Sequence, residues 1–441
     1  MDFIKREHGF FINNSWFAGS TSDKGQVVNP ADEKPVAEYL IANADDVEHA
    51  VVAARTAFEG REWKDMAPNK RTALLNKLAQ LLEERHEIIA ELITLENGKL
   101  YAQSKSEVLS AANTFRYYAG WATKIEGDTI DLSLKQAPGK KNFAFTLREA
   151  VGVVAAIVPW NFPISIASWK LAPLLAAGCT CILKPSELSP LSSLYMADLF
   201  AEAGFPAGVV NVVTGDGATG AALTSHPGID KITFTGSTKV GKIIGKTAMD
   251  NMTDLSLELG GKSPAIVFED ANLEEAAKGV AMGIFRNGGQ VCVAGSRVYI
   301  QETVFEQFIQ LLEQEASKLK ISDGFDPEAA LGPLVSDMQL QRVCNYLDNI
   351  NEHSQELITG GKKLDRPGFY IEPSIIKTKD NDNMIVREEI FGPVLMAIPF
   401  KDLQDALNKA NDSIYGLSST VWTRDINKAM NCVSGINAGW V

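Results

Sequence analysis

A single cysteine, Cys292, follows a short run of residues that favour a tight turn, namely Asn287, Gly288, Gly289 and Gln290. Glycine allows the backbone to turn sharply and leaves neighbouring side chains uncovered, so the thiol could face a cleft. A cysteine between two valines also suits a small residue of the hydrophobic core. From this stretch alone, both interpretations remain open.

Two segments earlier in the chain supply the groups that a nucleophilic thiol needs. Glu258 opens the stretch Glu-Leu-Gly-Gly-Lys, and Asn161 lies within Pro-Trp-Asn-Phe-Pro. Thiol catalysis requires a general base and a donor that stabilises the developing oxyanion. A carboxylate and a side-chain amide can fill these two roles, so the three residues together favour a catalytic thiol over a core cysteine.

The bulk properties exclude several classes of protein. A chain of 441 residues predicts two or three domains. The net charge of −13 and the pI near 5.0 argue against nucleic-acid binding, which needs basic patches. No apolar run approaches the roughly 18 residues of a membrane span, and the N-terminus lacks the apolar core of a signal peptide. The five cysteines lack disulfide spacing, which favours the reducing cytoplasm, and the five scattered histidines predict no metal site.

Elements that could position these groups follow from the pattern of apolar residues. Short apolar runs alternate with helical segments between residues 152 and 258, which predicts βαβ units and a parallel sheet. Ligands bind at the carboxyl ends of strands in such sheets. The predicted strands are Val153–Val158, Thr180–Leu183, Val209–Val213, Lys231–Thr235 and Leu255–Leu259.

A second alternation begins after Gly261 and predicts another α/β unit. It comprises strands Pro264–Phe268 and Arg297–Ile300 and helices over 272–285, 303–319 and 338–350. Short strands over 10–42 and helices over 45–59, from 69 to Gly98, and over 105–124 are expected at the N-terminal end. Residues 132–149 predict a hairpin that projects into solvent.

These motifs, in this order, resemble the aldehyde dehydrogenase family from about residue 10 to the last residue. The resemblance implies a Rossmann-type NAD domain over 1–131 and 150–258, an oligomerisation hairpin over 132–149, and an α/β catalytic domain over 259–441. A hairpin that is merely exposed to solvent remains an alternative. Relatives in the family are homodimers or homotetramers. They also continue for several tens of residues beyond Val441, so a shortened C-terminus is expected to affect assembly and the substrate tunnel.

Two glycine-rich loops compete for the phosphates of a dinucleotide. Gly215–Gly220 fits G-x-G-x-x-G, and the loop Gly236–Gly241 opens a helix whose N-terminus and Ser237 hydroxyl could donate to a pyrophosphate. The resemblance favours the second loop for the phosphates and places the first beside the adenosine. It further implies cofactor contacts by Ile157, Pro159, Trp160, Gly217, Phe234, Thr235, Gly236, Val240 and Leu259.

Lys184, Ser186 and Glu187 follow a predicted strand and could meet the adenosine ribose. A carboxylate accepts hydrogen bonds from ribose hydroxyls and repels a 2′-phosphate, so Glu187 favours NAD, although NADP remains possible. A surface Lys–Glu pair is the simpler alternative. Glu389 and Phe391 resemble residues that bind the nicotinamide ribose, but Glu389 beside Glu388 also suits a solvated acidic pair.

The resemblance implies that Cys292 attacks an aldehyde, with the oxyanion held by the Asn161 amide and the Cys292 backbone N–H. Hydride transfer to NAD leaves a thioester, which water activated by Glu258 hydrolyses. Lys170 matches a lysine proposed to relay protons. Phe162 and Trp169 flank the substrate tunnel of the family, which favours an apolar aldehyde.

Within the family, the resemblance is to phenylacetaldehyde dehydrogenases. The sequence segments that carry this resemblance are Lys124–Gly127, Gly152–Ala155, Ala222–Pro227 and Gly289–Cys292. Betaine aldehyde and other aliphatic aldehydes remain alternative substrates. Two other functions also remain open: a CoA-acylating dehydrogenase, which Glu258 disfavours, and a shortened protein that binds NAD without turnover.

Overall fold

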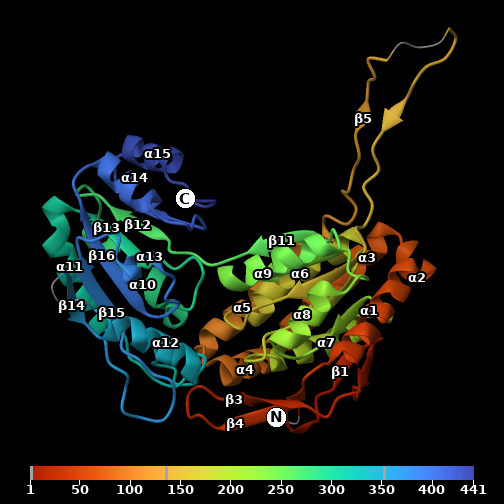
Figure 1. Ribbon diagram of the computed structural model, residues 1–441, viewed down its shortest axis with the longest axis horizontal. Coiled ribbons are helices and arrows are strands. Elements are labelled where there is room, and N and C mark those ends of the chain that lie inside the picture. Colours follow the sequence, from red (N-terminus) through yellow and green to blue (C-terminus); the bar gives the residue numbers. More distant parts are fainter. Residues whose placement is uncertain (1–2, 135–137, 351–353) are drawn as a thin grey trace.

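The computed structural model describes residues 3–134, 138–350 and 354–441. Two sheets lie side by side, each flanked by helices, and a long hairpin projects from one end of the molecule (Figure 1). Strands alternate with helices in both halves. The predicted α/β fold is therefore confirmed.

The first sheet has seven strands in the order β11-β10-β7-β8-β9-β1-β2. Five of them are parallel, and all five were predicted, while β1 and β2 form an antiparallel edge. The order reverses direction at β7, which has β8 on one side and β10 on the other. Their bounds are β1 Phe10–Ile12, β2 Ser15–Phe17, β7 Val153–Ile157, β8 Thr180–Lys184, β9 Val210–Val212, β10 Lys231–Thr235 and β11 Asp254–Glu258.

Helices between and before these strands cover both faces of the first sheet. The segment predicted as one helix from residue 69 to Gly98 is two helices, which corrects the prediction. The break falls at Arg85, whose ψ of 9° is not helical, and the apolar spacing continues across it. The bounds are α1 Ala44–Glu59, α2 Arg61–Lys64, α3 Pro68–Glu84, α4 His86–Asn97, α5 Tyr101–Ala119, α6 Pro163–Ala177, α7 Leu191–Ala203, α8 Gly217–Ser225 and α9 Thr238–Asp250.

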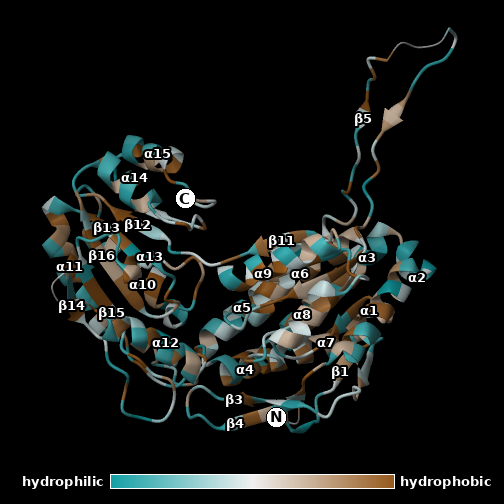
Figure 2. Ribbon diagram, viewed as in Figure 1, coloured by the Kyte–Doolittle hydropathy of each residue, from teal (hydrophilic) through white to brown (hydrophobic). Residues whose placement is uncertain are grey.

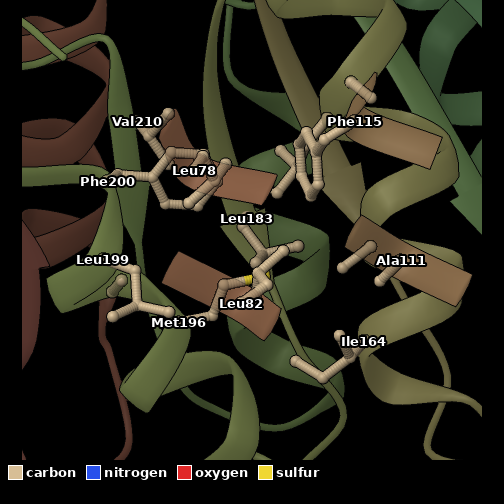
Figure 3. Packing of buried hydrophobic residues seen from close by; sticks show 14 of the residues in the cluster. Leu78, Leu82, Ala111, Phe115, Ile164, Leu183, Met196, Leu199, Phe200 and Val210 are labelled. Carbon is tan, nitrogen blue, oxygen red and sulfur yellow. The ribbon is translucent and has the colours of Figure 1, made fainter. Parts of the chain in front are cut away.

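The largest core lies between this sheet and helices α3, α5, α6 and α7. Figure 3 shows Phe115 of α5, Ile164 of α6 and Phe200 of α7 converging on Leu183 of β8. All four side chains are fully buried. Their burial fixes α6, which carries Lys170, against the strands whose ends form the site.

The second sheet has six strands in the order β14-β15-β16-β13-β12-β17, all parallel except the edge strand β14. Its strands are strongly hydrophobic in Figure 2, as in β12 and β16, whereas the surface helix α14 is largely hydrophilic. The bounds are β12 Pro264–Val267, β13 Arg297–Gln301, β14 Gln355–Thr359, β15 Ser374–Thr378, β16 Val394–Phe400, β17 Thr420–Trp422, α10 Leu273–Phe285, α11 Phe305–Ser317, α12 Asp337–Asp348, α13 Met384–Arg387, α14 Leu403–Asn411 and α15 Ile426–Gly435.

Two small antiparallel pairs complete the fold. Strands β3 (Lys24–Val28) and β4 (Pro35–Leu40) pair beside the N-terminus, and β5 (Thr129–Ile130) pairs with β6 (Ala144–Phe145) in the projecting hairpin. The hairpin pairing thus begins before residue 132, the predicted boundary. Part of its tip, residues 135–137, lies outside the described residues. Over the described ranges, no helix is both long enough and apolar enough to span a bilayer.

Candidate active site

The loop that carries Cys292 begins where α10 ends at Phe285. Three successive residues, Asn287, Gly288 and Gly289, have φ values of 53°, 64° and 70°, which turn the chain back sharply. A side chain at Gly289 would overlap the carbonyl of Gly392. The predicted tight turn is present, and it leaves Cys292 half-buried rather than in the core.

Two cavities meet at Cys292, which lines both of them. The smaller cavity has a volume of about 180 Å³ and lies against the carboxyl ends of β7 and β10. The larger cavity has a volume of about 680 Å³ and extends along α5 and α6. Ile166, Thr235 and Leu259 line both cavities. A molecule in either cavity can therefore reach the same sulfur atom.

The structure brings most of the predicted site residues to these two cavities. The smaller cavity contains Pro159, Trp160, Asn161, Thr235, Gly236, Ser237, Leu259, Cys292, Glu389 and Phe391. The larger cavity contains Phe162, Trp169, Lys170 and Glu258. Seven predicted residues line neither cavity: Ile157, Lys184, Ser186, Glu187, Gly217, Phe234 and Val240.

Asn161 follows β7 and is almost fully buried, with 2% of its surface exposed. Its side-chain Nδ2 donates a hydrogen bond of 2.9 Å to the carbonyl oxygen of Gln290. A primary amide carries two N–H groups, so this bond leaves one for a ligand atom. The bond also fixes Asn161 against the loop that carries Cys292.

Glu258 and Lys170 line the larger cavity from β11 and α6. Glu258 is exposed, whereas Lys170 is buried and donates a hydrogen bond of 3.0 Å to Thr233 Oγ1. Burial lowers the pKa of Lys170 to about 8, although the negative charge of Glu258 opposes this shift. Near neutral pH, Lys170 can therefore exchange a proton more readily than an exposed lysine.

The surroundings of Cys292 disfavour the thiolate in the protein alone. Burial is the main cause that raises the pKa of its thiol, and the negative charge of Glu389 raises it further. Since the thiolate is the reactive form, attack by Cys292 needs a base or a nearby positive charge.

Glu389 lies at the wall of the smaller cavity, where its Oε1 accepts a 3.0 Å hydrogen bond from the N–H of Gly261. A side chain at Gly260 would overlap this carboxylate. Glu389 is half-buried and is therefore not the solvated acidic residue of the alternative interpretation, and this burial raises the pKa of its carboxyl. Nearby, Trp160 and Phe391 make an edge-to-face contact with ring centroids 5.4 Å apart.

Sequence reasoning missed Gln339 and Arg342, which line the smaller cavity from α12. Gln339 Nε2 donates to the carbonyl of Phe391 (2.8 Å), and Arg342 Nη2 donates to the carbonyl of Glu389 (2.5 Å). Phe391 has a φ of 62°, an unfavourable conformation for an aromatic residue that these bonds hold in place. The helix was predicted, but its polar spacing alone gave no reason to assign it to a site.

The two glycine-rich loops differ in how their helix N-termini are occupied. At α8, Asp216 accepts hydrogen bonds from the N–H groups of Ala218 (2.8 Å) and Thr219 (3.3 Å). At α9, Ser237 Oγ accepts one bond from Val240 N–H (3.3 Å), and the hydroxyl hydrogen stays available. The α9 terminus also lies beside the point where the strand order reverses, so it is the better place for an anion.

Lys184 is the last residue of β8, and Ser186 and Glu187 follow it. Lys184 is buried, and its Nζ donates to the carbonyl of Pro185 (3.0 Å). Ser186 Oγ donates to Glu187 Oε2 (3.3 Å), while Glu187 is exposed. Burial lowers the pKa of Lys184, and the charges of Glu187 and Asp216 oppose that shift. The three side chains thus lie together at one strand end, as predicted.

Comparison with known proteins places the chain in a family. The model of the aldehyde dehydrogenase family matches residues 16–441. This chain belongs to the aldehyde dehydrogenase family. Its enzyme class, oxidation of an aldehyde, follows from that membership. No group of three or more histidine, cysteine, aspartate or glutamate side chains in the described part of this aldehyde dehydrogenase is arranged to hold a metal ion.

Individual relatives cover the whole of this aldehyde dehydrogenase. It is 42% identical to the phenylacetaldehyde dehydrogenase of Pseudomonas fluorescens, an alignment that covers 100% of this chain and 89% of the relative. The structure of the NAD+ complex of a Bacillus cereus aldehyde dehydrogenase has 42% identity and a TM-score of 0.97, covering 100% and 89%. A betaine aldehyde dehydrogenase of Staphylococcus aureus, also an NAD+ complex, has 36% identity and a TM-score of 0.96, covering 100% and 88%.

Proposed function

We propose that this aldehyde dehydrogenase oxidises an apolar, preferably aromatic aldehyde such as phenylacetaldehyde to the carboxylate, with NAD as the electron acceptor. The observation that carries the proposal is the position of Cys292 between the two cavities. In the proposal the smaller cavity holds the nicotinamide end of NAD and the larger cavity holds the aldehyde. The reacting carbon then lies between the thiol and the acceptor.

The residues around the smaller cavity suit a dinucleotide. The α9 terminus and the Ser237 hydroxyl supply donors for a pyrophosphate, and Gly236 leaves room for it. Glu389 keeps one oxygen for ribose hydroxyls because Gly261 occupies the other. In the proposal, the adenosine part of NAD contacts the predicted cofactor residues that line neither cavity, namely Ile157, Lys184, Ser186, Glu187, Gly217, Phe234 and Val240. The NAD+ complex of the Bacillus cereus relative supports this choice of cofactor.

In the proposed first step, the Cys292 thiol releases its proton to solvent, the thiolate Sγ forms a bond to the aldehyde carbon, and the C=O π bond breaks to leave an oxyanion. The second N–H of the Asn161 amide and the Cys292 backbone N–H stabilise that charge. Loss of one such donor costs roughly 3 kcal/mol of transition-state stabilisation. Bound NAD supplies the acceptor for the hydride that leaves this carbon, and the substrate remains attached to Cys292 as a thioester.

Glu258 then removes a proton from water, whose oxygen attacks the thioester and releases the carboxylate and the thiol of Cys292. A general base of this kind contributes about 10²- to 10⁴-fold to the rate. Lys170 is the candidate proton relay, because burial brings its pKa to about 8 and the charge of Glu258 acts on it. Through this exchange a proton taken by Glu258 can leave the cavity.

The walls of the larger cavity favour a neutral aldehyde over a cationic one. Phe162 and Trp169 supply aromatic surface for an apolar substrate. Arg286 lines the same cavity, and no described residue makes a hydrogen bond or an ion pair with its guanidinium. An unpaired positive charge disfavours the trimethylammonium group of betaine aldehyde.

The experiment compares kcat/KM for phenylacetaldehyde and betaine aldehyde at saturating NAD. We expect kcat/KM to be at least tenfold higher for phenylacetaldehyde. Arg286→Ala should reduce this ratio by raising kcat/KM for betaine aldehyde. Lys278→Ala, which removes an exposed charge on α10 paired with Glu275, is the control and should leave the ratio unchanged. A preference for betaine aldehyde in the unmodified protein would contradict the proposed substrate.

The arrangement of the chain also supports three broader proposals. We assign residues 1–131 and 150–258 to an NAD-binding domain and residues 259–441 to a catalytic domain, because each range contains one of the two large sheets. The hairpin 132–149 exposes Phe143, Phe145 and Leu147, which suits burial against another subunit of a homodimer or homotetramer. The free thiols support a cytoplasmic location, where Cys292 stays reduced.

A further inference from the structure

The backbone on either side of Asn161 is held by residues from the end of α4. Asn97 Nδ2 donates to the carbonyl of Trp160 (2.7 Å), and Lys99 Nζ donates to the carbonyl of Asn161 (2.8 Å). Gly98, between them, has a φ of 78° and ends the helix in the left-handed conformation. This turn lets both neighbouring side chains reach successive carbonyls of the segment that follows β7.

Lys99 is held in turn by a buried carboxylate. Its ammonium forms an ion pair with Glu107 Oε2, and the exposed fractions of the two side chains are 0% and 2%. Glu107 Oε1 accepts hydrogen bonds from the N–H groups of Ile164 (3.0 Å) and Ser165 (3.1 Å), in the first turn of α6. The Lys99 ammonium also lies 3.9 Å from the centroid of the Phe162 ring. Each charge therefore has fixed partners, as buried charges require.

These contacts fix Asn161 from two sides. Lys99 holds its backbone carbonyl, and the Gln290 carbonyl holds one N–H of its side chain. Asn287 Nδ2 also reaches the Asn161 carbonyl at 3.3 Å. The direction of the remaining side-chain N–H follows from these anchors. A displacement of about 1 Å in a catalytic group can reduce a rate 10²-fold, so an anchor at this point matters for chemistry.

We propose that Lys99, held by Glu107, is a positioning residue for aldehyde oxidation: it fixes Asn161 so that the free amide N–H meets the oxyanion on the substrate. This inference rests on the proposed function, because it gives Asn161 the oxyanion role. Lys99 touches neither the aldehyde nor NAD in this account. Its effect on the oxyanion passes through Asn161, and a burst rate read at saturating aldehyde separates this effect from the contact of its ammonium with the Phe162 ring.

The test is a double-mutant cycle of Lys99→Met with Asn161→Ala, read by the rate of the first NADH burst with phenylacetaldehyde. Asn161→Ala should slow the burst about 10²- to 10³-fold. Lys99→Met should slow it at least tenfold in the native background and less than twofold in the Asn161→Ala background, since the anchor then has nothing to position. The KM for NAD should change less than twofold in either variant.

Glu96→Gln is the matched control. Glu96 is also a buried carboxyl, but it belongs to α4, whereas Glu107 belongs to α5. It accepts hydrogen bonds from the N–H groups of Leu191 (2.6 Å) and Ser192 (3.2 Å) at the start of α7. It has no hydrogen bond to Asn161, and burial raises its pKa to about 8, so near pH 7 the substitution removes little charge from beside Lys99. Glu96→Gln should therefore lower the melting temperature and leave the burst rate within twofold. If Lys99→Met does not fold, Glu107→Gln replaces it, because the neutral amide weakens the hold on the ammonium and keeps the size of the side chain.

The possible outcomes separate the inference from the function on which it rests. Asn161→Ala with a native burst rate would remove the oxyanion role and the inference together. A slow Asn161→Ala variant whose rate Lys99→Met, or its replacement Glu107→Gln, lowers further by the full native factor would overturn the inference alone. A native burst rate in the Lys99→Met single variant, or in Glu107→Gln where it replaces Lys99→Met, would also overturn the inference alone. A reduction in burst rate that Lys99→Met causes in the native background but not in the Asn161→Ala background would support the positioning role of Lys99.

Discussion

The side-chain amide of Asn161 donates a 2.9 Å hydrogen bond to the carbonyl of Gln290, two residues before Cys292. Asn161 follows a strand of the first sheet, and Gln290 belongs to the loop between α10 and β13 of the second sheet. The bond therefore joins the two halves of the chain at the place where the two cavities meet. The distance between the amide and the thiol is set by this contact.

Glu258→Gln should separate the two halves of the reaction. The glutamine keeps the size of the side chain but cannot remove a proton from water, so the thioester on Cys292 should persist. We expect a burst of about one NADH per active site at a near-native rate, followed by turnover reduced about 10²- to 10⁴-fold. Stopped-flow absorbance measures both phases. Native steady-state turnover in this variant would remove Glu258 from the role of base.

The pH dependence of Cys292 alkylation should report the charge of Glu389. Burial and this carboxylate raise the pKa of the thiol, and alkylation needs the thiolate, so the rate should rise with pH and reach its midpoint above the usual cysteine range. Glu389→Gln removes one cause of the raised pKa and should move the midpoint to lower pH. Iodoacetamide labelling of the protein without NAD, followed by mass spectrometry, measures the curve.

Glu388→Gln is the matched control for this measurement. Glu388 carries the same charge one residue away, but it accepts a 2.6 Å hydrogen bond from the Tyr346 hydroxyl on the outside of the loop. Its loss should leave the midpoint in place. Equal midpoints for the native protein and Glu389→Gln would show that the charge of Glu389 does not contribute to the raised pKa of Cys292.

The sequence contained enough information to predict the parallel strands but not the whole wall of the site. Strand β7 and the segment after it combine an apolar run with a helix-breaking Pro-Trp-Asn-Phe-Pro, which is a local signal. Gln339 and Arg342 have no such signal, because their role depends on where α12 packs against the Glu389 loop. The same holds for Lys99, whose charge suggests a surface residue until Glu107 is seen beside it.

Boundaries were predictable only where a residue breaks the backbone pattern. Gly98 ends α4 with a left-handed conformation, and this end agrees with the expected one. The break at Arg85 has no glycine or proline, and the apolar spacing on either side suits one continuous helix. Strands β14 to β17 were also missed. Polar residues interrupt the short apolar runs of β14 and β17, whereas β16 is a continuous apolar run over Val394–Phe400 and carried the signal of a buried strand.

Glu187→Ala should allow the enzyme to use NADP as well as NAD. The carboxylate lies exposed at the end of β8 and would repel a 2′-phosphate, whereas Lys184 beside it would attract one. We expect the KM for NADP to fall at least tenfold and the KM for NAD to rise. Glu202→Ala, on the distant end of α7, removes an exposed carboxylate paired with Arg85 and should change neither constant. An unchanged KM for NADP in Glu187→Ala would place the adenosine ribose elsewhere.

The central claim is that Cys292 carries the substrate through oxidation. NADH absorbance at saturating NAD with phenylacetaldehyde tests it most directly, beside a Cys292→Ala variant shown to be folded and to bind NAD. The account predicts steady NADH formation by the native protein and none by the variant. NADH formation that persists in Cys292→Ala, or its absence in the folded native protein, would contradict the account.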